Sequence, residues 1–139
     1  MKTWLFRLWQ WIWGFPQTLI GLVFYCLHHK DPHWQYHGCI VTSWKVSGSL
    51  GVGMFLFVNE DHYASHPQVL VHEFGHAVQS AVLGPLFLPI MGIPSFLWCN
   101  LPLCRRLRRE KSISYYRFYP ESTANFLGSL VSRDPCDLK

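Results

Sequence analysis

Charged residues are scarce in this chain of 139 residues, because Asp, Glu, Lys and Arg together make up only 14% of it. Soluble domains usually carry about 25%. Hydrophobic residues make up 50% and aromatic residues 17%, which excludes an intrinsically disordered chain. The sequence also shows no short repeat, so a collagen-like or low-complexity array is excluded. The length is enough for one small domain, which we take to be residues 1–139.

Several functional motifs are missing as well. No Gly-rich phosphate-binding loop precedes a helix, and no basic face is interleaved with aromatic residues. We therefore expect no nucleotide and no nucleic acid among the partners. The five cysteines are odd in number and form no CxxC pair, which favours free thiols in apolar surroundings over a disulfide framework.

Apolar and aromatic residues are concentrated in residues 1–29. Tryptophan prefers the headgroup level of a bilayer, and four stand here: Trp4, Trp9, Trp11 and Trp13. Pro16 suits the first turn of a helix, and residues 18–27 are nearly all apolar. A signal peptide is the alternative, but no small-x-small cleavage site follows. We expect a membrane anchor that spans the bilayer or lies in its interface, with membrane lipid as a partner.

Residues 30–37 are polar and rich in histidine, and we expect a loop there. His29, His33 and His37 are spaced by four residues, but Pro32 lies within that spacing and argues against a regular helix. Solvated or interfacial histidines are therefore favoured over a metal site.

Residues 38–58 have the composition of β-structure. Positions 39–46 are rich in β-branched and aromatic residues, positions 54–58 form a second candidate strand, and a Ser-Gly-Ser turn signal lies between them at 47–49. We expect a β-hairpin. Its Gly-rich segment 48–51 would let another backbone come close, and a plain stabilising hairpin is an equally open alternative.

Residues 66–83 predict a helix that is apolar over most of its circumference, as in helices buried in protein or lipid. The next segment, residues 84–103, is apolar, and its central part is broken by Pro89, Gly92 and Pro94. These favour a re-entrant or kinked segment over a straight transmembrane helix. The basic run at 105–111 marks a cytoplasmic flank if the positive-inside rule holds.

The string His72-Glu73-Phe74-Gly75-His76 carries the chemistry. Positions four apart lie on one face of a helix, so His72 and His76 can take two corners of a tetrahedral zinc site. Glu73 points away from both rings but can reach a water on the metal, whose pKa falls toward ~7 on zinc. The carboxylate can take that water's proton as it attacks a carbonyl group. A buried helix whose His and Glu side chains satisfy one another is the alternative.

A catalytic zinc needs a third protein ligand. No third histidine follows in the HExxHxxGxxH arrangement, and the two glutamates downstream are Glu110 and Glu121. Glu110 lies in the basic run, where ion pairing explains it. Glu121 follows Pro120, a reasonable helix start, and shares a helical face with Asn125. Glu121 is then either a zinc ligand, with Asn125 orienting a histidine, or a helix N-terminal carboxylate favoured by the macrodipole.

At these residues the chain resembles the gluzincin metallopeptidases. Within them it is most similar to the membrane-embedded family of the heat-shock membrane protease and the CAAX-prenyl endopeptidase, which carries HExxH on one helix and ExxAD on a later one. The second string here is Glu121-Ser122-Thr123-Ala124-Asn125. The chain is also similar to small bacterial membrane proteins of unassigned activity that carry a HEFGHxxQSxxLGPL string. The resemblance covers residues 66–84 and 119–128.

The resemblance implies zinc as the cofactor, His72, His76 and Glu121 as its ligands, and Glu73 as the general base. It also implies that Asn125 replaces the Asp that hydrogen-bonds a ligand His. A neutral Asn can hold the ring but cannot raise its basicity as a carboxylate would.

In such enzymes an edge strand before the HExxH helix binds extended substrate, and the predicted hairpin is placed for that role. A Tyr or His near the third ligand often donates a hydrogen bond to the transition state. The candidates here are Tyr115, Tyr116 and Tyr119, which interfacial anchoring explains equally well.

Together these features predict an α+β fold, namely a mainly helical, small membrane-associated domain with a minimal zincin-like core. The helix of the third ligand is expected at residues 120–131. The expected function is a membrane-associated zinc metallopeptidase acting on a peptide or membrane-protein substrate, with its site on the cytoplasmic side near the interface. The alternative is a non-proteolytic zinc-binding membrane protein, such as an accessory, immunity or assembly factor, that retains the metal site.

Overall fold

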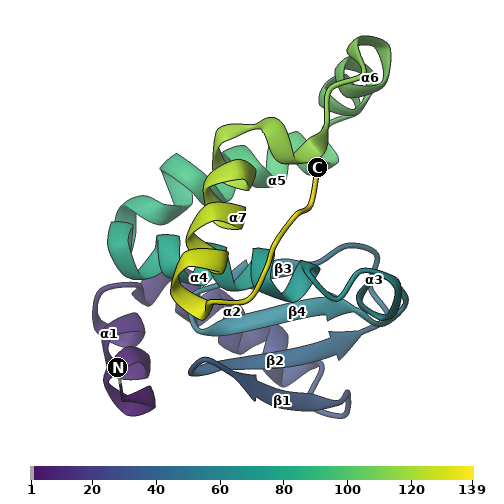
Figure 1. The fold of residues 1–139 in the computed structure, drawn as a ribbon. Coiled ribbons are helices and arrows are strands. Elements are labelled where there is room, and N and C mark those ends of the chain that lie inside the picture. The colour runs from purple at the N-terminus through teal and green to yellow at the C-terminus, as the bar shows by residue number, and fades with distance from the viewer. Residues whose placement is uncertain (1) are drawn as a thin grey trace.

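The structure is a computed structural model that describes residues 2–139 (Figure 1). Its α-helices are α1 (Thr3–Ile12), α2 (Phe15–Leu27), α3 (Glu60–Ser65), α4 (Val69–Leu83), α5 (Ile93–Asn100), α6 (Pro102–Lys111) and α7 (Tyr119–Ser132). The shorter helical turns are η1 (Gly84–Leu86), η2 (Leu88–Gly92, a π-helix) and η3 (Tyr115–Arg117). The strands are β1 (His33–Tyr36), β2 (Cys39–Trp44), β3 (Leu50–Val52) and β4 (Phe55–Asn59). The predicted α+β class is confirmed.

The four strands form one mixed sheet in the order β1-β2-β4-β3. Strands β2 and β4 are neighbours, but they run parallel, so the hairpin predicted at residues 38–58 is wrong. The tight hairpin is instead β3–β4, which turns at Gly53 with a φ of +62°. A backbone with positive φ favours glycine, and the Gly-rich stretch provides this turn one strand later than the sequence suggested.

The loop predicted at residues 30–37 is also wrong, because β1 occupies its second half and pairs antiparallel with β2. His37 and Gly38 form the two-residue turn between them, and both have positive φ, at 46° and 89°. Two successive left-handed residues match the right-handed twist of a hairpin. His33 and Tyr36 therefore belong to an edge strand rather than to a solvated loop.

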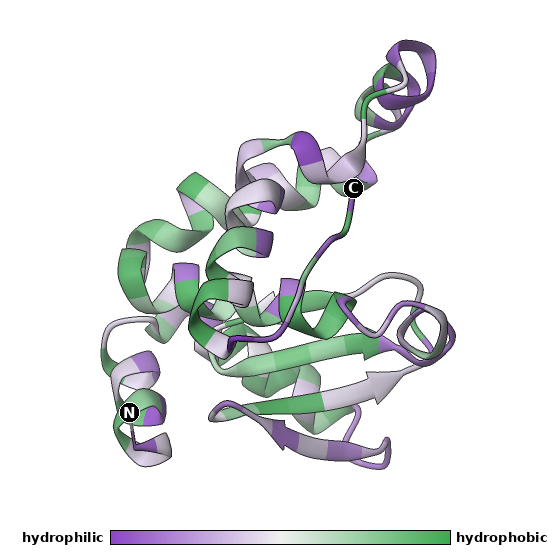
Figure 2. Ribbon diagram, in the orientation of Figure 1, coloured by the Kyte–Doolittle hydropathy of each residue, from purple (hydrophilic) through white to green (hydrophobic). Residues whose placement is uncertain are grey.

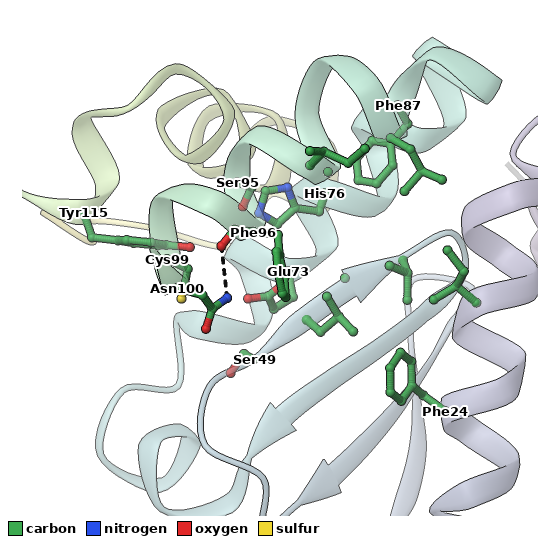
Figure 3. Close-up of a pocket in the computed structure, with 17 residues that line it drawn as sticks. Phe24, Ser49, Glu73, His76, Phe87, Ser95, Phe96, Cys99, Asn100 and Tyr115 are labelled. Carbon is green, nitrogen blue, oxygen red and sulfur yellow. Dashed lines mark hydrogen bonds between the residues drawn. The ribbon is translucent and has the colours of Figure 1, made fainter. Parts of the chain in front are cut away.

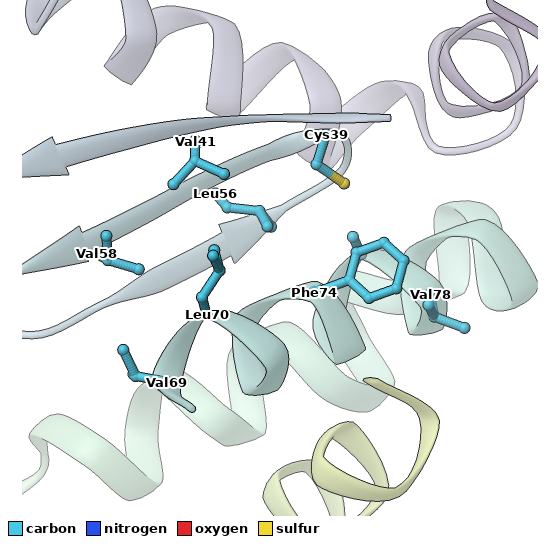
Figure 4. Packing of buried hydrophobic residues seen from close by; sticks show 9 residues of the cluster. Cys39, Val41, Leu56, Val58, Val69, Leu70, Phe74 and Val78 are labelled. Carbon is cyan, nitrogen blue, oxygen red and sulfur yellow. The ribbon is translucent and has the colours of Figure 1, made fainter. Parts of the chain in front are cut away.

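The sheet is covered on both faces, which explains the unbroken apolar run of β4. Leu56 and Val58 face α4, where they meet Leu70 and Phe74 (Figure 4). The alternate residues of β4 face the other way and pack with Phe24 and other aromatic residues of α2. A strand buried on both faces does not alternate between apolar and polar residues. Helix α4 is thus held against the sheet by one side, and α7 covers its other side (Figure 1).

A buried polar cluster joins the N-terminal helices to the end of α4. Gln10 donates to the Ala77 carbonyl oxygen at 2.9 Å and accepts from the Ser80 hydroxyl at 2.8 Å. Gln17 donates to the Ser80 hydroxyl oxygen at 2.7 Å and to the Gly84 carbonyl oxygen at 2.9 Å. These hydrogen bonds tie α1 and α2 to α4 and to Gly84, the residue that follows it, and so fix where α4 lies.

Two of the tryptophans predicted to lie at a bilayer surface hydrogen-bond within the protein. The indole nitrogens of Trp9 and Trp13 donate to the carbonyl oxygens of Ala81 and Val82, at 2.7 and 3.3 Å. The segment predicted as a membrane anchor consists of two helices, α1 and α2, that are separated at Trp13–Gly14. Within residues 2–139, no helix combines the length and the hydropathy that a membrane crossing requires.

Helices α4 and α7 cross at very short range. A Cβ atom on Gly75 would lie 1.8 Å from the carbonyl oxygen of Ala124, and one on Gly128 would lie 2.1 Å from that of Val71. Both obstacles are backbone atoms, which cannot rotate away. The glycine inside the HExxH string is therefore the residue that lets the two helices touch, and their contact brings the site together.

Candidate metal centre

Helices α4 and α7 place two histidines and one glutamate around a common point. The Nε2 atom of His72 lies 2.9 Å from Oε2 of Glu121, and Nε2 of His76 lies 3.3 Å from the same oxygen. His72 and His76 are one turn apart on α4, as their spacing predicts, and their ring centroids are 4.9 Å apart. One donor atom from each of the three residues lies within 4.8 Å of the others.

The three side chains are shielded from solvent. Glu121 is fully buried, and His72 and His76 are exposed by 2% and 6%. Burial favours the protonated form of Glu121, but its hydrogen bonds with the two histidines outweigh that effect and hold its pKa well below the usual range. Burial likewise depresses the pKa of His76, but the hydrogen bond and charge of Glu121 raise it to about 9. A buried negative charge facing two imidazoles attracts a cation.

The other ring nitrogens are bound to amide oxygens. Nδ1 of His72 donates to Oδ1 of Asn125 at 2.5 Å, as the position of Asn125 on α7 predicted. The Asn125 amide is oriented by the C-terminal segment, since its Nδ2 atom donates to the Leu138 carbonyl oxygen at 3.2 Å. Because this bond keeps a proton on Nδ1, loss of the Nε2 proton would leave a lone pair on Nε2 of His72 that can bind a metal.

Gln79 orients His76 as Asn125 orients His72, and this role was not predicted from the sequence. Its Oε1 atom accepts from Nδ1 of His76 at 2.8 Å, and its Nε2 atom donates to the Pro120 carbonyl oxygen at 2.9 Å. Pro120 directly precedes Glu121, so one buried amide links a ligand on α4 to the start of α7. The spacing of three residues between His76 and Gln79 was a usable signal, because such positions are neighbours on a helix.

The structure also brings Ser95 of α5 to the site. Its hydroxyl donates to Oε1 of Glu121, the carboxylate oxygen that the histidines leave free. Both oxygens of Glu121 are thus held, and its carboxylate faces the two rings in a fixed orientation. Supporting hydrogen bonds of this kind set the geometry and basicity of metal ligands.

Replacing Gln79 by methionine should weaken zinc binding about 10- to 100-fold, the usual cost of losing a residue that orients a metal ligand. Methionine keeps the volume but removes both hydrogen bonds of Gln79. Zinc affinity would be measured by competition with a chelator. The matched control is Gln35→Met, which makes the same chemical change on an exposed position of β1. Equal affinity for both variants would show that Gln79 does not position His76.

A cavity of about 340 Å³ opens beside the metal-site residues. Glu73 and His76 of α4 point into it, and α5 forms the opposite wall with Ser95, Phe96 and Cys99 (Figure 3). Burial raises the pKa of Glu73 above its ordinary value. Glu73 does not belong to the group of metal donors, yet its carboxylate reaches the same cavity as His76. Glu73 therefore lies beside the candidate metal ligands without being one of them.

The floor of this cavity is the edge strand β3. Residues 49–52 line it, and a Cβ atom on Gly51 would lie 2.6 Å from the Glu73 carbonyl oxygen and 3.1 Å from its Oε2 atom. Glycine at this position thus lets the strand lie directly against the HExxH helix. Strand β3 pairs with β4 along one side only, and its other side borders the cavity.

The three candidate tyrosines occupy different surroundings. Tyr115 lines the cavity, and burial raises the pKa of its hydroxyl. Tyr116 places its ring against that of His72, with centroids 5.1 Å apart. Tyr119 donates its hydroxyl proton to the Ile90 carbonyl oxygen at 2.6 Å and is 46% exposed. Of the three, Tyr115 is the one that shares the cavity with Glu73.

The histidines of the segment 28–37 do not gather. His33 contacts the Thr42 hydroxyl at 2.8 Å and the His29 carbonyl oxygen at 3.1 Å, so its ring binds protein groups. Among residues 2–139, the one group of three or more donors close enough to share an ion is His72, His76 and Glu121. The described cysteines are free thiols, as expected from their number and spacing.

No protein-family model, curated protein or solved structure matches this chain. What the chain does show is a buried group of two imidazoles and one carboxylate that can bind a metal ion. The residues fit such an ion chemically, because both Nδ1 atoms are occupied by amide oxygens and both Nε2 atoms face Glu121. Two nitrogen donors and one carboxylate are a known ligand set of catalytic zinc.

Proposed function

We propose that this protein is a membrane-associated zinc metallopeptidase. The observation that carries the proposal is the convergence of His72, His76 and Glu121 next to a cavity that Glu73 enters. A structural metal site is usually closed by four protein ligands. Only three protein donors are grouped here, and one of them, His76, lines the open cavity, which would leave a position for a reacting group as in a catalytic site.

His72, His76 and Glu121 would hold the metal. Zinc, when bound, lowers the pKa of a coordinated water toward ~7 and polarises a carbonyl group. Asn125 and Gln79 keep the two imidazoles oriented, and Ser95 keeps the carboxylate of Glu121 from rotating.

Glu73 is the proposed general base. Its carboxylate lies in the cavity beside His76, and its raised pKa makes it a stronger proton acceptor than an exposed glutamate. It accepts a proton from the attacking water and passes it to the amine that leaves. Tyr115 is the proposed donor to the oxygen of the scissile carbonyl, since its hydroxyl remains protonated at neutral pH and it lines the same cavity.

Strand β3 is the proposed binding site for the substrate backbone. An extended peptide that adds to its free edge would place its own backbone beside Glu73, because Gly51 brings the strand within van der Waals range of α4. The walls contributed by Phe87, Ile93 and Phe96 favour apolar side chains in the peptide.

Metal dependence is the test of this function. We expect the purified full-length protein to hydrolyse a library of fluorescence-quenched peptides, to lose this activity on treatment with a zinc chelator, and to regain it when zinc is added. Hydrolysis that persists in metal-free protein would contradict the proposal.

The second candidate function is a zinc-binding protein without proteolysis, such as an accessory, immunity or assembly factor. The neutral Asn125 favours it, because an amide raises the basicity of His72 less than a carboxylate would. In that case the protein binds zinc but leaves every peptide in the library intact.

A further inference from the structure

Helix α6 carries the entire excess of positive charge in this protein. It contains five basic residues and one acidic residue, a net charge of +4, which equals the formal charge of the whole chain. The remaining residues therefore sum to zero. Helix α6 projects from the end of α5, away from the sheet (Figure 1), and most of it is coloured hydrophilic in Figure 2.

The position of α6 is fixed by two of its arginines. The Arg108 guanidinium lies over the Trp98 ring at 4.9 Å and over the Tyr115 ring at 5.4 Å, and it donates to the Trp98 carbonyl oxygen. Arg105 donates to the Cys99 carbonyl oxygen at 3.0 Å. These contacts tie α6 to α5. The other basic side chains of α6 are exposed: Arg106, Arg109 and Lys111.

Apolar side chains stand exposed on the same stretch of chain. Leu103 and Leu107 are one helical turn apart on α6 and are exposed by 73% and 42%. On α5, Ile93 and Phe96 are exposed by 52% and 62%. These two α5 residues also line the cavity that holds Glu73. The cavity rim, the exposed apolar side chains and the basic helix are thus contiguous in sequence, over residues 93–111.

We infer that residues 93–111 form a docking surface for a bilayer that contains anionic lipid. Leucine and phenylalanine side chains enter the acyl boundary, while arginine and lysine bind the charged headgroups. A nucleic acid would use the charges but would leave Leu103 and Leu107 in water. Docking in this way turns the cavity rim toward the membrane, so a peptide would reach Glu73 from the bilayer surface. Only this last consequence rests on the proposed function, because lipid binding itself needs neither metal nor catalysis.

Vesicle flotation of the full-length protein tests the inference. We expect stronger binding to vesicles of phosphatidylcholine with phosphatidylglycerol than to phosphatidylcholine alone, and a loss of this difference at high salt. The variant Arg106→Gln/Arg109→Gln/Lys111→Gln removes the exposed charges but keeps the two arginines that hold α6. Each lost charge should weaken anionic binding roughly fivefold, for a total of about 100-fold. The control variant, Lys30→Gln/Lys45→Gln/Lys139→Gln, changes the net charge equally at exposed sites elsewhere and should bind nearly as the wild type.

A second variant, Leu103→Ser/Leu107→Ser, should weaken binding to both kinds of vesicle by about tenfold or more. Equal binding of the wild type to neutral and anionic vesicles would overturn the inference. So would an equal loss in the control variant. If a single-stranded RNA oligonucleotide binds more tightly than anionic vesicles and needs the same three charges, α6 is a nucleic-acid element and the inference is wrong. Flotation measures lipid binding and not hydrolysis, so none of these outcomes depends on the peptidase proposal.

Discussion

The Glu73→Gln variant is expected to lose peptide hydrolysis by about 10³-fold in kcat/KM while it binds as much zinc as the wild type. Glutamine has nearly the shape of glutamate, so the cavity wall is kept, but it cannot accept a proton. Zinc content should be unchanged because Glu73 lies outside the group of metal donors. Hydrolysis would be followed with the quenched peptides and zinc by elemental analysis.

The matched control is Glu60→Gln, which makes the same change on the exposed first turn of α3 and should leave hydrolysis intact. If Glu73→Gln hydrolyses peptides as fast as the wild type, Glu73 is not the general base. If neither protein hydrolyses peptides while both bind zinc, the non-proteolytic alternative holds.

The Gly75→Ala variant is expected to lose both stability and zinc binding. The added Cβ atom would lie 1.8 Å from the Ala124 carbonyl oxygen, so α7 must move away from α4. Overpacking of a close contact lowers the free energy of unfolding by up to about 3 kcal/mol. The movement also separates Glu121 from the two histidines. Thermal unfolding and a zinc titration would measure the two effects.

The matched control for this variant is Gly92→Ala, which also adds a methyl group to a helical glycine. Its nearest obstacle is the flexible end of the Leu88 side chain, at 3.1 Å, which can shift. We expect this control to retain wild-type stability and zinc affinity. If the Gly75→Ala protein is as stable as the control, the close approach of α4 and α7 is not required for stability, and the prediction is wrong.

Local periodicity explains what could be predicted of the site. His72 and His76 are four residues apart in an apolar helix, and Glu121 and Asn125 repeat that spacing after Pro120, so each pair shares a helical face. Both pairs meet in the structure. Their meeting depends on Gly75 and Gly128, whose role becomes visible only when the two helices are packed together.

The parts that could not be predicted depend on distant contacts. Gln79 gains its role from the Pro120 carbonyl oxygen, 41 residues away. Strand β3 contains three residues, one of them Gly51, and its place at the sheet edge follows from packing against α4 rather than from its composition. Strand β1 is a four-residue edge strand, and its pairing with β2 gives it a regular structure that its sequence does not indicate.

The zinc content of the wild type and of Glu121→Ala tests the central claim most directly. Glu110→Ala serves as the control, because Glu110 is the other downstream glutamate and pairs with Arg106 at the surface of α6. We predict one zinc ion per chain in the wild type and in the control, and an affinity weaker by more than about 100-fold in Glu121→Ala, since a ligand itself is removed. A Glu121→Ala protein that retains zinc with wild-type affinity would contradict the account.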